Sequence, residues 1–331
     1  MEVYGDTLDI IVDVNGHGDF ASINEAVQNT GAESINIELK KGIYYEKVMI
    51  KGKSKVKICG EGMSDTIIIY NDGGFDMMPD GQKRGTFNSY TAYFECKYLK
   101  LSNLSIINAA GDGRVHGQSI AAYFDSRLAE CENCAFDSCQ DTLFLAPLPD
   151  KEREKGGFRG PGEFNKRLMT ESFFTGCYIT GDVDFIFGGG TAAFSGCRIN
   201  SKDRGAGKNK LNCENSDIPE VNGYVAAPSG KKGTEGFVFE RCGFISDGAY
   251  AKKVYNMDEI RKFCSFEESA LMDYFRVSES CAPQTVYLAR PWRPDGRALF
   301  SRCFFGEHIK KEAFSGWFKN EKVSENFRID G

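Results

Sequence analysis

Proline, histidine and tryptophan are scarce in this chain of 331 residues, with 9, 3 and 2 copies respectively. No apolar run approaches the ~18 residues that a membrane-spanning helix needs, so no such helix is expected. A Gly-x-Ser-x-Gly motif is absent, and the three histidines (His17, His116 and His308) show no partner pattern. Serine-esterase chemistry is therefore set aside.

The chain also has no excess of positive charge. The net charge is −6, so nucleic acid is not expected as a partner, and we expect no membrane partner either. The first residues, Met1 to Asp6, carry neither a basic segment nor an apolar one, so no signal peptide is expected. The twelve cysteines then indicate reduced thiols in a cytoplasmic protein. A secreted protein is the alternative if a leader has been removed.

What the chain does contain is a repeated pattern, apolar-x-apolar-x-x-Cys-x-apolar. Six copies occur, the first with Leu in the cysteine position. They end in the pairs Leu104/Ile106, Cys134/Phe136, Cys177/Ile179, Cys197/Ile199, Cys242/Phe244 and Cys303/Phe305. The alternation of two predicts strands, and the long-range repetition predicts stacked coils. We predict an all-β fold, a right-handed parallel β-helix, forming one domain over residues 1–331.

The cysteines of the repeat are predicted to form an inward-facing ladder, because a free thiol packs as a small apolar side chain. Cys131-x-x-Cys134 could instead indicate a zinc site, but no second Cys/His pair has the required spacing. Near the N-terminus, Ser22 and Glu25 match a capping box, which predicts a short capping helix that reaches about Gln28.

Three insertions interrupt the repeat, at residues 146–167, 201–222 and 247–283. The first is charged and glycine-rich, and the third contains a helix-like stretch from Met257 to Phe263. We expect loops that flank a groove, with solvent-exposed decoration as the alternative for the second. The basic residues of the first insertion could attract an acidic ligand, or could form an ordinary solvated loop.

Polar residues recur at one phase of the repeat. Gln118 and Gln140 are 22 residues apart, and Asp141 and Asp184 are 43 apart, or 21 once the 22-residue first insertion is left out. Coil stacking would bring the two aspartates together, where like charges resist simultaneous ionisation. Arg290 follows another strand at the same phase and could keep one of them ionised. The glutamines offer N–H donors suited to an oxyanion, whereas a single Asp or Gln here would more simply cap a turn.

Several motifs along the chain belong together: Asp13-x-x-Gly16-x-Gly18-Asp19-Phe20, Gly42-x-Tyr44-x-Glu46, Gly85-Thr86-Phe87-x-Ser89-x-Thr91, Gln118, Gln140-Asp141-Thr142-Leu143, Asp184-Phe185-Ile186-Phe187-Gly188 and Arg290-Pro291-Trp292. With these motifs the chain resembles the pectin methylesterase (pectinesterase) family of parallel β-helix carbohydrate esterases. The resemblance implies that Asp184 is the nucleophile, Asp141 the general acid and base, and Gln118 and Gln140 the oxyanion donors. It further implies that Arg290 keeps Asp184 ionised and that Thr86, Phe187 and Trp292 contact the sugar.

The implied activity is hydrolysis of C6 methyl esters in homogalacturonan or oligogalacturonides, with release of methanol and without a metal or other cofactor. The first insertion and the missing signal hint at a short oligogalacturonide as substrate, and a monomer is expected. Two alternatives stay open at this point. One is another β-helix pectinolytic enzyme, a polygalacturonase or a lyase, and the other is a non-catalytic polysaccharide-binding β-helix.

Overall fold

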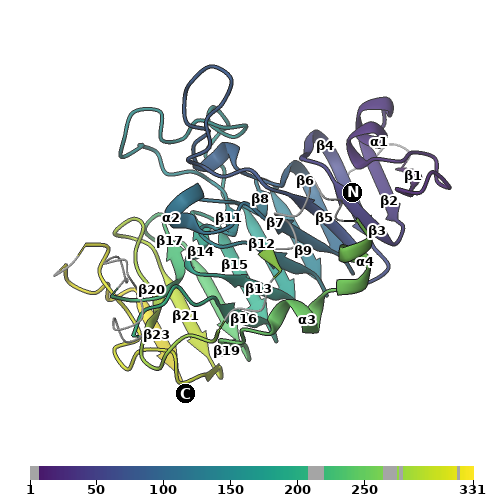
Figure 1. Ribbon diagram of the computed structural model, residues 1–331. Coiled ribbons are helices and arrows are strands. Elements are labelled where there is room, and N and C mark those ends of the chain that lie inside the picture. Colours follow the sequence, from purple (N-terminus) through teal and green to yellow (C-terminus); the bar gives the residue numbers. More distant parts are fainter. Residues whose placement is uncertain (1–6, 208–219, 264–273, 276–278, 319–320) are drawn as a thin grey trace.

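The computed structural model describes residues 7–207, 220–263, 274–275, 279–318 and 321–331. Its strands wind into coils that stack along one axis, with the N- and C-termini at opposite ends of the stack (Figure 1). In the described part of the chain the strands form one sheet of 15 and one of 8, and every strand pairing within both is parallel. The predicted parallel β-helix is confirmed.

Each coil contributes strands to three faces. Two faces belong to the larger sheet because the long strands β4 (Val48–Cys59) and β6 (Ala92–Ser102) run across both. The first face continues with β8 (Ala122–Phe124), β11 (Leu143–Leu145), β14 (Val183–Gly188), β17 (Gly223–Pro228) and β20 (Val286–Ala289). The second face contains β1 (Thr7–Val12), β2 (Ser34–Leu39), β9 (Leu128–Glu132), β12 (Glu171–Thr175), β15 (Thr191–Ser195), β18 (Phe237–Glu240), β21 (Ala298–Ser301) and β23 (Phe327–Asp330).

The third face is the smaller sheet. It consists of β3 (Gly42–Tyr45), β5 (Thr66–Tyr70), β7 (Ser105–Asn108), β10 (Ala135–Asp137), β13 (Tyr178–Gly181), β16 (Arg198–Ser201), β19 (Gly243–Ile245) and β22 (Phe304–Phe305). The repeat found in the sequence spans the turn between the second and third faces.

The core is built from ladders of equivalent repeat positions. The rings of Phe174, Phe194, Phe239 and Phe300 stack in succession, with centroids 4.8, 4.6 and 4.9 Å apart and planes within 10° of parallel. Such aromatic pairs contribute about 0.5–1.5 kcal/mol each beyond the area they bury. The stacking follows from the parallel register, because strands about 4.8 Å apart place identical side chains directly above one another.

The cysteine ladder is also present. Cys134, Cys177, Cys197 and Cys242 are buried and are free thiols. The Sγ of Cys197 donates to the carbonyl of Phe174 at 3.4 Å, one coil away, and equivalent contacts recur along the ladder. Cys131 and Cys134 therefore pack in the core, as predicted.

One residue before the cysteine position, the backbone of each of the six repeat copies turns through a left-handed conformation. Asn103, Asn133, Arg241 and Arg302 have φ between 51° and 54° there, and the remaining two copies have glycine. This turn shifts the alternation of inward- and outward-facing side chains by one residue between the second and third faces. The repeat therefore keeps its apolar residues inside on both sides of the turn.

Short helices cap and flank the stack. In α1 (Ile23–Asn29) the Ser22 hydroxyl accepts from the N–H of Glu25 at 3.1 Å, and the Glu46 carboxylate accepts from the N–H groups of Ile23 and Asn24. The predicted capping helix is therefore confirmed. Helix α4 (Met257–Phe263) has the predicted bounds. The remaining helices of the described residues are η1 (Thr86–Asn88), α2 (Gly113–His116) and α3 (Tyr250–Val254).

Helices α3 and α4 pack their apolar residues against the outer side of the third face, next to Ile43, Ile67 and Ile107 (Figure 1). The rest of the third insertion falls largely outside the described residues, as do residues 208–219 of the second and residues 1–6. The single domain over residues 1–331 therefore stays a prediction. Within the described helices, none has the length and apolar character needed to cross a membrane.

Candidate active site

The two aspartates singled out in the sequence lie side by side on consecutive coils. Leu143 of β11 pairs with Ile186 of β14, which sets Asp141 opposite Asp184 two residues earlier on each coil. The N–H of Asp141 donates to the carbonyl of Val183 at 3.0 Å. The predicted stacking is present because the first insertion loops out between β11 and β12.

An irregularity in β14 aims Asp184 out of the core. Val183 pairs with Tyr224 and Ile186 with Ala226, so β14 has one residue more than β17 between these pairs. Such a bulge redirects a side chain and is common beside active sites. Asp184 and Asp141 both have left-handed backbones, with φ of 51° and 65°. A sparsely populated conformation of this kind costs about 1–3 kcal/mol, and such strain clusters at functional sites.

Arg290 holds Asp184 through both carboxylate oxygens. The Nε atom donates to Oδ1 at 2.8 Å and Nη2 donates to Oδ2 at 2.6 Å, a bidentate geometry. The guanidinium lies between two aromatic rings, 3.8 Å from the Tyr224 centroid and 4.4 Å from that of Trp317. Burial lowers the pKa of Arg290, but the charge and hydrogen bonds of Asp184 outweigh it and raise the pKa overall. The two side chains thus form a bidentate ion pair.

Asp141 has the opposite environment. It is buried, and this burial raises its pKa well above the ordinary value; the charge of Asp184 raises it further, while Arg290 acts less strongly in the opposite sense. Burial therefore favours the protonated form of Asp141, whereas Asp184 is paired with the guanidinium of Arg290. Two adjacent acids in different environments can divide the roles of nucleophile and proton donor.

Gln118 and Gln140 stand on consecutive coils beside the acids. The N–H of Ser119 donates to the carbonyl of Gln140 at 2.9 Å, and the Gln140 side chain forms a hydrogen bond with Asp141. Close backbone approach confines both amide side chains. A Cβ on Gly74 would lie 3.0 Å from Oε1 of Gln118, and one on Gly113 would lie 2.8 Å from Oε1 of Gln140. The glycines let the flanking loops hold the amides in place.

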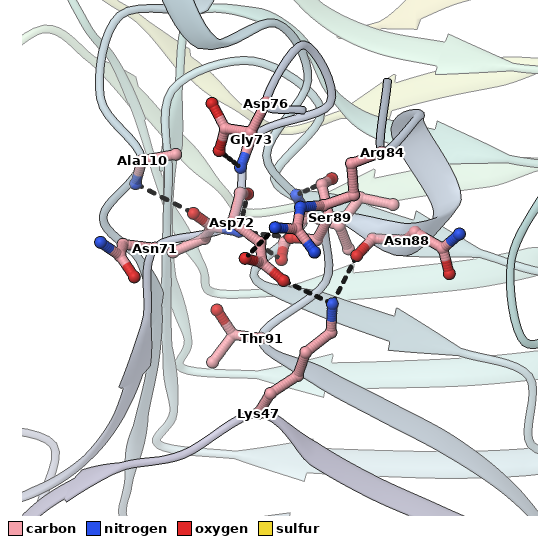
Figure 2. A network of polar contacts seen from close by, with 12 residues as sticks. Lys47, Asn71, Asp72, Gly73, Asp76, Arg84, Asn88, Ser89, Thr91 and Ala110 are labelled. Atoms are coloured by element: carbon pink, nitrogen blue, oxygen red, sulfur yellow. Dashed lines mark hydrogen bonds and ion pairs between the residues drawn. The ribbon is translucent and has the colours of Figure 1, made fainter. Parts of the chain in front are cut away.

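A buried ion network anchors the loop that carries Thr86. Asp72 accepts from Nζ of Lys47 at 2.5 Å and pairs with Nη2 of Arg84 at 3.0 Å, and the Lys47 Nζ also donates to the carbonyl of Asn88 (Figure 2). Within the same loop the N–H of Gly74 donates to the carbonyl of Gln118 at 2.7 Å. The network therefore fixes the loop on which both Thr86 and the backbone of Gln118 depend.

All eight residues predicted for the site line one pocket of about 340 Å³. They are Thr86, Gln118, Gln140, Asp141, Asp184, Phe187, Arg290 and Trp292. The lining combines these polar groups with aromatic rings, among which Phe187 and Trp292 have a centroid distance of 5.7 Å. A pocket that combines apolar side chains with a few convergent polar groups is typical of small-ligand sites. The fold thus brings the predicted residues together, and their individual roles stay predictions.

Several pocket residues were missed at the level of sequence. They are Phe87, Glu154, Phe158, Arg293 and Trp317. Trp317 could have been noticed because it is one of only two tryptophans in the chain. The first insertion flanks the pocket as expected, and Arg153, one of its basic residues, is part of the lining.

A larger cavity, of about 530 Å³, lies beside the site and contains none of the eight predicted residues. Its lining includes Cys139 and Asp182, the chain neighbours of Gln140 and of Val183, and a network in which Asp137 accepts from Lys202 and Tyr274 at 2.7 Å each. We assign the chemistry to the smaller pocket because the strained aspartates and the bidentate arginine lie there. Among the described residues, no group of three or more His, Cys, Asp or Glu side chains is placed to hold a metal ion.

Comparison with protein families gives a match to the pectinesterase model over residues 9–148. A probable pectinesterase 56 of Arabidopsis thaliana is 26% identical over 316 residues, which is 94% of this chain and 85% of the relative. A pectinesterase/pectinesterase inhibitor U1 of Solanum lycopersicum is 25% identical over 95% of this chain, and the match spans 43% of that protein. A third relative, the putative pectinesterase/pectinesterase inhibitor 26 of Arabidopsis thaliana, is 34% identical over 57% of this chain and 17% of its own length.

Solved structures with the same fold are pectin methylesterases. The protein from carrot superposes with a TM-score of 0.65 at 20% identity, covering 97% of this chain and 81% of its own. The enzyme from Erwinia chrysanthemi has a TM-score of 0.63 at 20% identity, with 100% and 94% coverage. A pectin methylesterase in complex with a hexasaccharide has a TM-score of 0.64 at 20% identity, with 97% and 92% coverage. At this identity the structures establish the shared fold, and the sequence relatives confirm the resemblance that the motifs carried.

Proposed function

We propose that this chain, an esterase of the pectinesterase type, hydrolyses the C6 methyl esters of galacturonate units and releases methanol. The substrate is pectin or a methylated oligogalacturonide. The observation that carries the proposal is the pair of adjacent acids, with Asp184 held by both guanidinium contacts of Arg290 and Asp141 buried with a raised pKa. This arrangement offers a nucleophile and an acid in one pocket.

Asp184 is the nucleophile in this mechanism. One of its oxygens attacks the ester carbonyl carbon, and the carbonyl electrons move onto oxygen to give a tetrahedral oxyanion. Arg290 orients the carboxylate, and the Tyr224 and Trp317 rings fix the guanidinium plane from either side. The left-handed backbone and the bulge at Asp184 hold the attacking oxygen toward the pocket.

Gln118 and Gln140 stabilise the oxyanion through their amide N–H groups. Their restraint by Gly74 and Gly113 means that little reorganisation is needed when the charge develops. Loss of one such donor typically raises the barrier by about 3 kcal/mol.

Asp141 acts first as an acid and then as a base. It protonates the departing methoxide, and collapse of the oxyanion leaves an anhydride between Asp184 and the sugar. The ionised Asp141 then takes a proton from water, and the hydroxide attacks the anhydride carbonyl. Cleavage regenerates the Asp184 carboxylate, releases the galacturonate carboxyl group and leaves Asp141 protonated for the next cycle.

The aromatic wall receives the sugar. Phe187 and Trp292 present their rings to the pocket, and Thr86 contributes a hydroxyl at its edge. A pyranose ring has apolar C–H faces that suit such a wall. A cytoplasmic location and a monomeric state accompany the proposal as predictions, to be checked by cell fractionation and sedimentation.

The test is to measure methanol release from methylated oligogalacturonides and from polymeric pectin. The same reactions are assayed for new reducing ends and for unsaturated products. We expect methanol alone, and we expect Asp184→Asn to abolish it with the circular dichroism spectrum unchanged. Reducing ends or unsaturated products would indicate a hydrolase or a lyase, and substantial methanol release by Asp184→Asn would overturn the assignment.

A further inference from the structure

Asp182 is a third buried carboxyl group beside the two acids of the site. It stands two residues before Asp184, and its side chain is 5% exposed. Asp184 lines the pocket of about 340 Å³, whereas Asp182 lines the neighbouring cavity of about 530 Å³. Burying a carboxyl group costs free energy unless the group is paired and hydrogen-bonded, so the contacts of Asp182 indicate what it is there to hold.

Each oxygen of the Asp182 carboxylate has its own partner. Oδ1 accepts from the N–H of Val183, the next residue, at 2.6 Å. Oδ2 lies 3.6 Å from Nε of Arg204, and this nitrogen has no hydrogen-bond partner among the described residues. The first contact fixes the peptide between Asp182 and Val183, and the second places a positive charge beside the carboxylate.

Main-chain hydrogen bonds connect this peptide to both acids of the site. The N–H of Asp182 donates to the carbonyl of Cys139 at 2.8 Å, and the N–H of Asp141 donates to the carbonyl of Val183 at 3.0 Å. The two bonds run in opposite directions between consecutive coils. Val183 also immediately precedes Asp184, whose left-handed backbone has a φ of 51°. A side chain that fixes the Val183 peptide therefore helps to fix the positions of both acids.

Arg204 is brought to Asp182 by the second insertion. The N–H of Arg204 donates to Oδ1 of Asn222 at 2.7 Å, and the N–H of Ala206 donates to the same oxygen at 3.1 Å. Asn222 is fully buried, and its Nδ2 donates to the hydroxyl of Thr285 at 2.9 Å. The backbone of Arg204 is therefore fixed against the coil.

Asp182 faces charged groups from several segments of the chain. Burial raises its pKa, and the charge of Arg204 is the largest of the influences that lower it. The other titratable groups of the described residues that act on Asp182, or on which it acts, are Asp112, Arg114, Cys139, Asp141 and Lys202. Arg204 and Lys202 both favour the carboxylate form of Asp182.

The charge of Asp182 acts in turn on Asp141. Burial and the charge of Asp184 raise the pKa of Asp141 most, and the charge of Asp182 raises it further. The guanidinium of Arg204, at 3.6 Å, balances the charge of Asp182. Removal of Asp182 and removal of Arg204 should therefore change the charge beside Asp141 in opposite senses.

We propose that Asp182 is a positioning residue for the esterase reaction, with Arg204 as its counter-ion. The carboxylate holds the main chain that carries Asp184 and Asp141, and the pairing with Arg204 limits the negative charge beside the two acids. The inference rests on the proposed function and gives a role to two residues that do not line the pocket. Both act through the two acids of the site.

The experiment measures kcat for methanol release from methylated oligogalacturonides as a function of pH. Asp141 must be protonated to donate to the departing methoxide, so kcat should fall as the pH rises through the pKa of Asp141. Asp182→Asn removes the charge but keeps an oxygen for the N–H of Val183, and the fall should move to lower pH by about half a unit or more. Arg204→Gln leaves the charge of Asp182 unbalanced, and the fall should move to higher pH.

Asp182→Ala tests the hold on the main chain separately from the charge. It removes the oxygen that accepts from the N–H of Val183, so at the optimal pH its kcat should be about tenfold or more below that of Asp182→Asn, while KM changes little. Equal kcat values in the two variants would overturn the positioning role. Should Asp182→Ala fail to fold, the pH profiles of Asp182→Asn and Arg204→Gln decide the inference.

Asp247→Asn is the matched control. Asp247 lines the same cavity as Asp182, pairs with the exposed Lys253 and, as asparagine, keeps an oxygen for the N–H of Ala249. It is not among the groups that act most on Asp141 or Asp182, so its pH profile should equal that of the wild type. An unmoved profile in Asp182→Asn or in Arg204→Gln, or an equal shift in the control, would overturn the inference.

The two proposals fail in different ways. If the wild type releases no methanol at any pH, the proposed function is wrong. If it releases methanol and the substitutions of Asp182 and Arg204 leave the pH profile where it was, the esterase stands and the positioning role does not.

Discussion

Asp141 and Asp184 lie on consecutive coils with their backbones in the same left-handed conformation, yet the groups around their carboxylates differ. Arg290 donates two hydrogen bonds to Asp184, whereas burial and the charge of Asp184 together disfavour ionisation of Asp141. This difference between the two acids depends on Arg290, which follows β20 and so lies on another coil than either aspartate.

Replacing Arg290 by lysine should lower kcat by about 100-fold or more. Lysine keeps the positive charge but cannot form the bidentate contact or stack between Tyr224 and Trp317. The measurement is methanol release under saturating substrate. Arg297→Lys is the control, because Arg297 is exposed and does not line the pocket, and its turnover should equal that of the wild type. Wild-type turnover in Arg290→Lys would contradict the role given to the pair.

Replacing Asp141 by asparagine should abolish turnover and also change how stability depends on pH. The native pKa of Asp141 is raised above its unfolded value, so the group costs stability as the pH rises from the unfolded pKa (about 4) toward the native one. The asparagine variant lacks this cost. Its melting temperature relative to the wild type should therefore increase as the pH rises through that window. A difference that is flat or falls with pH would contradict the buried, protonated state of Asp141.

Replacing Gln118 or Gln140 by methionine should each raise the barrier by about 3 kcal/mol, which lowers kcat roughly 100-fold while KM changes little. Methionine keeps the length of the side chain and removes the amide donor. Gln82→Met, at an exposed position, is the control and should behave as the wild type. A change confined to KM would show that the amides bind the ground state and do not act as an oxyanion hole.

Replacing Asp72 by asparagine should destabilise the protein by about 2 kcal/mol, because Lys47 is left largely buried without its anion and Arg84 loses its partner. The loop carrying Thr86 loosens as a result, so KM should rise more than kcat falls. Urea unfolding and steady-state kinetics measure the two effects. Glu325→Gln, which breaks the exposed pair of Glu325 with Lys322, should change neither.

Thiol labelling should distinguish the buried cysteines of the ladder from the exposed Cys59 by their rates of reaction. Cys59 is exposed, whereas burial raises the pKa of Cys134 to about 12 and leaves its thiol protonated and out of reach. A thiol reagent should therefore label Cys59 rapidly in the native protein, and the buried ladder cysteines only after unfolding. Peptide mapping by mass spectrometry assigns each label to its residue, and rapid labelling of Cys134 in the native protein would contradict the packed ladder.

Much of the architecture was predictable because it follows from short local motifs and from residues that recur at a regular spacing along the chain. The repeated cysteine and aromatic positions predict inward-facing ladders, and Phe174, Phe194 and Phe239 stack as that periodicity requires. The capping box at Ser22 needs only its neighbours in the chain. The spacing of Asp141 and Asp184 was informative for the same reason, since each coil uses nearly the same number of residues.

Other features could not be derived in this way. Arg153, Arg293 and Trp317 reach the pocket from an insertion and from C-terminal loops, where no period relates them to the acids. The ion network at Asp72 joins residues from three separate segments. Contacts of this kind depend on how the loops fold back over the coils. The spacing of the repeat does not predict the conformation of the insertions between its copies.

The order of residues along the chain thus determines the coil, its ladders and the phase at which the polar groups recur, because these follow from a period of two within strands and about 22 between them. The tertiary structure alone decides which acid pairs with an arginine and which has its pKa raised by burial. That outcome depends on burial and on the approach of a guanidinium from a distant coil, and both are properties of the folded molecule in three dimensions.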